Sequence, residues 1–199
     1  MKNQLYVLSL LLLIISCNEN PKETKRGSIS SATENVEEEV LTNSYQDSKS
    51  QKADYKTLKK LTPLSSKELL PFLPERLNKL ANFSMYAYPG NQQMATGSYG
   101  SLDNAYNFSI EDGAGSKAIV RNFFDSYKVK LQGPPQTQYI FTKRDSYKTI
   151  AFLQPTINRN QISFIYNNRF KITLEGVDSA DTLWSYLEFD NLKKLDQLN

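Results

Sequence analysis

Apolar and polar residues alternate with a period of two along most of the chain beyond residue 80. This period is typical of β-strands with one buried face, because successive side chains of a strand point to opposite sides. Turn-forming sequences such as Pro89-Gly90 and Asn167-Asn168 interrupt the alternation. The strands predicted in this way are 83–87, 94–99, 106–111, 139–142, 147–153, 162–166 and 169–175.

Helical periodicity replaces this alternation in the first part of the domain and again in its middle. Ser65 and Glu68 have the spacing of a capping box and predict a helix start. Pro74 predicts a second helix after a break, because proline is favoured in the first helical turn. Apolar residues from Val120 to Leu131 then recur at helical intervals and predict another helix.

A last helix is predicted near the C-terminus, with Asp178 as its N-cap. Its apolar stripe includes the only tryptophan of the chain, Trp184, which we expect to be buried against the sheet. Helix, three strands, helix, four strands, helix is therefore the predicted order. Because short turns force antiparallel pairing, we expect an α+β domain. Its single twisted antiparallel sheet should have about six to seven strands, with the helices packed on one face.

The N-terminus carries a different pattern, a short cationic start followed by apolar residues from Leu5 to Ile15. This segment is too short to span a bilayer, which takes about 20 residues as a helix, and is typical of a secretory signal. It ends in Ile14-Ile15-Ser16-Cys17, which resembles the lipobox of bacterial lipoproteins. The resemblance implies cleavage before Cys17 and lipidation of that residue. A plain signal peptide or short anchor with an incidental cysteine is the alternative.

Residues 17–60 are rich in serine, threonine, lysine and glutamate and have few aromatic side chains. Such a segment buries too little apolar surface to offset its chain entropy, so it is predicted to be a flexible tether. The predicted organisation is therefore a signal peptide over 1–16, a lipidated Cys17 with its tether over 17–60, and a globular domain over 61–199.

Composition excludes several kinds of chemistry. The chain has no histidine and one cysteine, so histidine-based catalysis, histidine metal ligands and an intrachain disulfide are all excluded. Its 24 basic and 21 acidic residues give a net charge of +3, too balanced to indicate nucleic-acid binding. We expect no cofactor and no bound metal.

Two surfaces are candidate binding sites. Tyr86, Tyr88 and Tyr99 could form an exposed aromatic patch for a sugar, a peptide or a partner protein. The alternative is that these tyrosines simply occupy positions on the two faces of alternating strands and form no binding site.

The second candidate is the turn that contains Asp112, Gly113 and Gly115, between a predicted strand and a predicted helix. Its backbone N–H groups could hold an anion, although the phosphate-loop spacing is absent. An ordinary turn with Ser116 as the helix N-cap is the simpler interpretation. Glu111 and Asp112 should point to opposite faces of their strand, so we do not expect them to form a catalytic pair.

Two short sequences, Asp178-Ser179-Ala180 and Asp181-Thr182-Leu183, resemble the O-glycosylation motif of Bacteroidota envelope proteins, with Ser179 and Thr182 as acceptors. The domain also resembles a group of small bacterial lipoproteins and periplasmic proteins. The matching pieces are Leu69-Leu70-Pro71, Ile110-Glu111-Asp112 with Gly115, Asn168-Arg169-Phe170, Leu174-Glu175-Gly176, and Phe189-Asp190-Asn191-Leu192 with Leu195.

The leading functional hypothesis is a lipid-anchored envelope protein that binds a small ligand or a partner protein without catalysing a reaction. The anchor would hold the domain in the periplasm or at the cell surface, the outer membrane being favoured over the inner. One alternative is a hydrolase-type enzyme that uses carboxylate or Tyr/Lys groups in a cleft of the sheet. A structural subunit of an envelope complex is the other.

Overall fold

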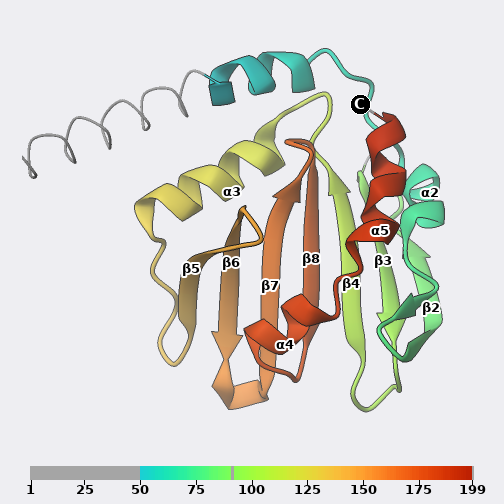
Figure 1. Cartoon of the computed structure of the whole chain (residues 1–199), viewed down its shortest axis with the longest axis vertical. Helices are drawn as coiled ribbons and strands as arrows, with labels where there is room; N and C mark the ends of the chain where they lie inside the picture. Colours follow the sequence, from blue (N-terminus) through green and yellow to red (C-terminus); the bar gives the residue numbers. More distant parts are fainter. Residues whose placement is uncertain (1–49, 91, 199) are drawn as a thin grey trace, which may run out of the picture. The chain divides into compact units, whose positions relative to one another are not determined.

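The computed structural model describes residues 50–90 and 92–198, all of which belong to the compact unit Asn43–Asn199. An eight-stranded antiparallel sheet, in the order β1-β2-β3-β4-β8-β7-β6-β5, forms its centre (Figure 1). The strands are β1 Arg76–Leu77, β2 Leu80–Ala87, β3 Met94–Tyr99, β4 Tyr106–Asp112, β5 Gln138–Arg144, β6 Tyr147–Gln154, β7 Arg159–Tyr166 and β8 Phe170–Gly176. The predicted α+β class and the antiparallel sheet are confirmed.

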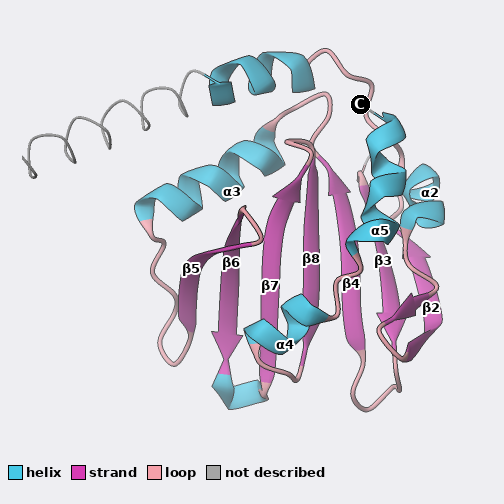
Figure 2. Cartoon of the chain, in the orientation of Figure 1, coloured by secondary structure: helices cyan, strands magenta, loops and turns pink. Residues whose placement is uncertain are grey.

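Short helices connect and flank the strands (Figure 2). Residues 50–58 form the first described helix. The others are α2 Ser66–Leu69, η1 Leu70–Phe72, α3 Ala118–Val129, η2 Pro155–Ile157, α4 Ala180–Ser185, α5 Phe189–Leu192 and η3 Lys193–Leu198. Ser65 and Glu68 form the predicted capping box at the start of α2.

The strand number was predicted too low, because the chain makes a hairpin where a helix was expected after Pro74. Leu77 pairs with Leu80 across a two-residue turn, in which Asn78 has a φ of 54°. Asparagine tolerates this left-handed conformation, which ends any helix. The spacing of the leucines in this segment fits a helix as well as a hairpin, so periodicity alone did not separate the two.

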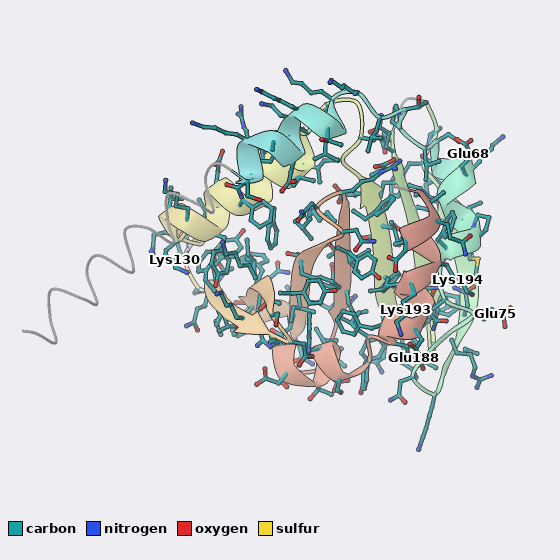
Figure 3. The ribbon with its side chains drawn as sticks, turned by 45° about the horizontal axis from the view of Figure 1, so that its top comes forward. Glu68, Glu75, Lys130, Glu188, Lys193 and Lys194 are labelled. Atoms are coloured by element: carbon teal, nitrogen blue, oxygen red, sulfur yellow. The ribbon has the colours of Figure 1, made fainter. Side chains whose placement is uncertain are left out.

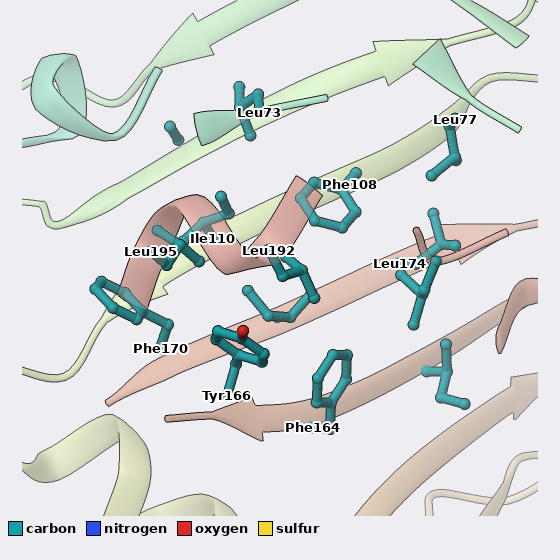
Figure 4. Packing of buried hydrophobic residues seen from close by; sticks show 14 of the residues in the cluster. Leu73, Leu77, Phe108, Ile110, Phe164, Tyr166, Phe170, Leu174, Leu192 and Leu195 are labelled. Carbon is teal, nitrogen blue, oxygen red and sulfur yellow. The ribbon is translucent and has the colours of Figure 1, made fainter. Parts of the chain in front are cut away.

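The prediction that all helices pack on one face of the sheet was wrong. α2, α4, α5 and η3 cover the larger core, shown in close-up in Figure 4. α3 and residues 50–58 cover part of the opposite face, where Val120 and Phe123 pack with Ile150 and Ile165. Side chains of β7 alternate between the two faces, so Ile162, Phe164 and Tyr166 enter the larger core and Ile165 enters the smaller one.

The boundary at residue 61 was also placed too late. Leu58 is buried, and its carbonyl accepts a hydrogen bond from the Gly115 N–H at 2.8 Å. Tyr55 and Leu61 pack against the same small core. The domain therefore includes residues 50–60, while the rest of the predicted tether, the signal peptide and Cys17 lie outside the described residues.

Candidate functional site

A cleft of about 320 Å³ opens between α3 and the sheet, and we call it the α3 cleft. Asn122 and Ser126, which have short polar side chains, line it on the helix side. The lining comes from α3 and from strands β4 to β8: Glu111, Ile119, Asn122, Phe123, Ser126, Leu131, Tyr139, Phe141, Ile150, Phe152, Gln161, Ser163 and Lys171.

The part of the cleft nearest the sheet edge is aromatic. Tyr139 of β5 stacks on Phe152 of β6, with ring centroids 4.5 Å apart and planes inclined by 26°. Phe141 lies beside Tyr139 at 6.1 Å. All three rings are partly exposed, but Lys130 Nζ lies 4.9 Å from the Phe141 ring centroid. The flat apolar surface left for a ligand ring is therefore mainly that of Tyr139 and Phe152.

The opposite part of the cleft is polar. Lys171 Nζ of β8 lies 3.3 Å from Glu111 Oε1 of β4, and both side chains are about three-quarters buried. Gln161 and Ser163 of β7 complete this wall. The pair balances its own charge, so the cleft can accept a neutral ligand with both apolar and hydrogen-bonding groups.

Thr173 lies next to this polar wall, because it pairs in register with Ser163 of β7 and Ser109 of β4. Its side chain is 7% exposed, and its hydroxyl has no hydrogen-bond partner among the residues that the structure describes. An unsatisfied buried hydroxyl costs about 1–3 kcal/mol. The floor beside the cleft therefore retains an unused hydrogen-bonding group.

The predicted tyrosine patch is only partly assembled. Tyr86 and Tyr88 make an edge-to-face pair, with ring centroids 4.9 Å apart, and Tyr86 is exposed. Tyr99 does not join them: it is fully buried in the larger core and donates its hydroxyl hydrogen to the Pro74 carbonyl at 2.7 Å. The reason is register, since Tyr86 pairs with Thr96, and Tyr99 points to the other face of β3.

Asp112 is a structural residue rather than part of an exposed anion site. It is completely buried and accepts two hydrogen bonds from the guanidinium of Arg169, both at 2.8 Å. It also accepts the N–H groups of Leu64 and Ala114 at 2.9 Å. Arg169 in turn donates to the Leu198 carbonyl. Through Leu64 and Leu198, the ion pair therefore links β4 to segments near both ends of the domain.

The backbone N–H groups of the two glycines in this turn already have hydrogen-bond partners. The Gly113 N–H donates to the Arg169 carbonyl at 3.0 Å, and the Gly115 N–H donates to the Leu58 carbonyl. A Cβ at Gly113 would lie 2.7 Å from the Arg169 carbonyl oxygen, so only glycine allows this approach. Lys117, with a φ of 59°, is the N-cap residue of α3 in place of the expected Ser116.

The C-terminal predictions need two corrections. Ser179, not Asp178, caps α4 and accepts the Thr182 N–H, while Asp178 accepts hydrogen bonds from the hydroxyls of Tyr106 and Tyr186. Trp184 contacts Phe164 of the sheet as expected but is only half-buried, and its indole N–H donates to Asp145 at 2.8 Å. Neither result tests glycosylation of Ser179 or Thr182.

The tyrosines with the largest pKa shifts lie away from the α3 cleft. Burial raises the pKa of Tyr99, Tyr106 and Tyr166 well above the ordinary value, and all three face the larger core. No group of three or more acidic or cysteine residues suited to a metal ion occurs in the described part of the chain. The largest tyrosine pKa shifts therefore belong to residues of the larger core and not to residues that line the cleft.

The cleft residues were not predicted from the sequence. Lys171 and Glu111 lie 60 positions apart and meet only because β8 pairs with β4. Tyr139 and Phe152 were expected in strands, but no sequence signal joins them to α3. Glu111 and Asp112 do point to opposite faces, as predicted.

Comparison of the chain with protein-family models, with curated proteins and with solved structures found no match in any of the three. No helix in residues 50–90 and 92–198 is long and apolar enough to cross a membrane. The α3 cleft therefore has to be interpreted from its own residues.

Proposed function

We propose that this chain is a lipid-anchored protein of a bacterial cell envelope, and that its domain binds a ligand in the α3 cleft. The anchor is Cys17, in the lipobox-like sequence Ile14-Ile15-Ser16-Cys17. The binding role is supported mainly by one observation, a hollow of about 320 Å³ with an aromatic half and a polar half. Such a combination orients an amphipathic ligand through a few polar contacts while burying its apolar part.

Binding without catalysis is the simpler role for this cleft. Glu111 is the single carboxylate among the described residues that line it, and Lys171 neutralises it. The alternative hydrolase would use carboxylate or Tyr/Lys groups placed at the substrate. Lys171 and Tyr139 do line the cleft, but Lys171 is paired with Glu111 and Tyr139 is stacked on Phe152, so each already has a structural partner. We therefore assign recognition to the polar wall and stacking to Tyr139 and Phe152.

The binding proposal can be tested with anilinonaphthalene sulfonate, an aromatic probe whose fluorescence rises in apolar sites. Ser126→Trp should abolish this rise, because an indole at that position fills the cleft. Lys128→Trp is the matched control, since Lys128 lies on the same helix outside the lining and is exposed. Equal probe binding by both variants and the wild type, all with native melting temperatures, would disprove the role of the cleft.

The anchor is tested separately. Cys17→Ala should release the domain from membranes or leave an unprocessed precursor, because it removes the acyl acceptor. Two or more acyl chains bind a membrane stably, whereas one binds only marginally. Metabolic acyl labelling that persists in Cys17→Ala would rule out lipidation at this residue.

A second candidate function, subunit of an envelope complex, is favoured by the part of strand β2 that extends past the two-residue edge strand β1, which pairs only with Leu80 and Ala81. Phe83, Met85 and Tyr86 are 40%, 44% and 52% exposed there. An apolar edge strand is a site where a strand of another chain can pair. In that case Met85→Lys should remove a discrete cross-linked adduct that the wild type forms in cells, and an unchanged adduct would count against this function.

A further inference from the structure

The α3 cleft is one end of a longer polar surface on the same face of the sheet, which we call the polar face. It spans strands β2, β3, β4, β8 and β7. Their outward side chains lie in cross-strand rows, set by the pairing register. The rows are Ser84, Ser98, Asn107, Glu175 and Gln161; Tyr86, Thr96, Ser109, Thr173 and Ser163; and Met94, Glu111, Lys171 and Ile165.

The polar face has no net charge. Its two acidic residues are each paired, Glu111 with Lys171 at 3.3 Å and Glu175 with Arg159 at 2.8 Å. The other polar groups in the rows are hydroxyls and amides. A surface of this kind offers many hydrogen bonds and no net attraction for an anion or a cation.

Hydrogen-bonding capacity remains in the middle of the polar face. Thr173 lies between Ser109 and Ser163 in its row, with a buried hydroxyl that has no partner in the described part of the chain. Because this hydroxyl is buried, a ligand oxygen could bond it only after neighbouring side chains had moved aside. The gain would be larger than at a group already satisfied, because the unpaired state is costly.

Aromatic rings mark both ends of the polar face. Tyr86 and Tyr88 form their edge-to-face pair at the β2 end, and Tyr139 with Phe152 lies in the α3 cleft. From β2 to β6, the strand of Phe152, there are five strand spacings, or about 24 Å at roughly 4.8 Å each. The surface is therefore longer than the cleft and suits an extended ligand that crosses the strands.

We propose that the ligand of this domain is a neutral oligosaccharide, which lies across the strands with one end in the α3 cleft. Sugar rings have apolar C–H faces that stack on aromatic side chains, and hydroxyls that bond to Ser, Thr, Asn and Gln groups. The neutrality of the polar face selects an uncharged chain over an acidic peptide or a nucleic acid. This inference rests on the proposed binding role of the cleft and specifies its ligand class.

The experiment uses the purified domain with its native residues from 43 onwards, on an array of immobilised neutral and anionic oligosaccharides of increasing length. Neutral chains should bind, and affinity should rise with length until the chain spans the polar face. Tyr86→Ala should weaken the longer chains about tenfold and leave the shortest chains unchanged. Met85→Ala is the matched control, because Met85 is similarly exposed on β2 but points to the other face.

The experiments distinguish a wrong ligand class from a wrong assignment of the α3 cleft as a binding site. If anilinonaphthalene sulfonate binds and Ser126→Trp blocks it, but no neutral oligosaccharide binds, the α3 cleft is still a binding site. The proposed ligand class is then wrong. If anionic chains bind better than neutral ones, or if Tyr86→Ala and Met85→Ala weaken binding equally, the oligosaccharide inference is overturned. Melting temperatures of all variants confirm that the fold is intact.

Discussion

Removing the carboxylate of Asp112 should destabilise the domain strongly. Asp112→Ala leaves the guanidinium of Arg169 in the protein interior without its counter-charge, since the two side chains are 0% and 4% exposed. It also removes the acceptor of two backbone N–H groups, those of Leu64 and Ala114. These losses act together because one carboxylate serves all the donors.

The expected magnitude follows from the burial of this pair. Breaking a buried ion pair by removing one partner typically costs about 3–5 kcal/mol. For a domain of this size, each 1 kcal/mol lowers the melting temperature by about 2–4 °C. Asp112→Ala should therefore melt about 6–20 °C below the wild type and shift the urea midpoint by about 2 M, taking a denaturant slope of about 2 kcal/mol per molar.

Urea unfolding followed by circular dichroism measures this change. Asp190→Ala is the control, because Asp190 and Lys193 (labelled in Figure 3) have side chains that are 90% and 67% exposed. An ion pair this exposed should contribute nothing measurable. Arg169→Met combined with Asp112→Ala should lose less stability than Asp112→Ala alone, since no unpaired charge stays buried. A midpoint for Asp112→Ala equal to that of the control would refute the structural role of this carboxylate.

Gly113→Ala should cost about 1–3 kcal/mol in urea unfolding, because its Cβ would press on the Arg169 carbonyl oxygen, which belongs to the backbone and cannot turn away. A second expectation concerns pH: burial raises the pKa of Tyr166 above the ordinary 10.0, so the folded state holds the phenol proton more tightly than the unfolded state. Stability should be full below about pH 10 and fall as pH rises further. The part of the phenolate absorbance that comes from the buried tyrosines should appear only together with unfolding. Trp184→Ala should lower the melting temperature more than Trp184→Phe, which keeps an aromatic contact with Phe164; equal losses would mean that this packing is unimportant.

Local sequence patterns determined most of the secondary structure. The period-two segments became strands β2 to β8, and the helical spacing from Val120 onwards became α3. Short turns between strands then made antiparallel pairing the expected arrangement. The exception was the segment after Pro74, where leucine spacing fitted both a helix and the β1–β2 hairpin.

Tertiary structure decided which side chains share a surface. Alternation shows that Tyr86 and Tyr88 lie on one side of their strand, but only the register, with its irregularity between Asn82 and Ser84, sends Tyr99 to the other face. A shift of one residue would exchange the two faces, and nothing local to β2 or β3 fixes it.

By itself, the sequence determined the α+β class, the positions of the strands and the absence of histidine chemistry, since these depend on composition and on neighbours in the chain. Only the tertiary structure brought Glu111 to Lys171 and set Tyr139 and Phe152 beneath α3. It also buried Asp112, a residue that looked like part of a surface turn. The physical reason is that burial and cross-strand contact depend on packing between distant segments, which short-range periodicity does not encode.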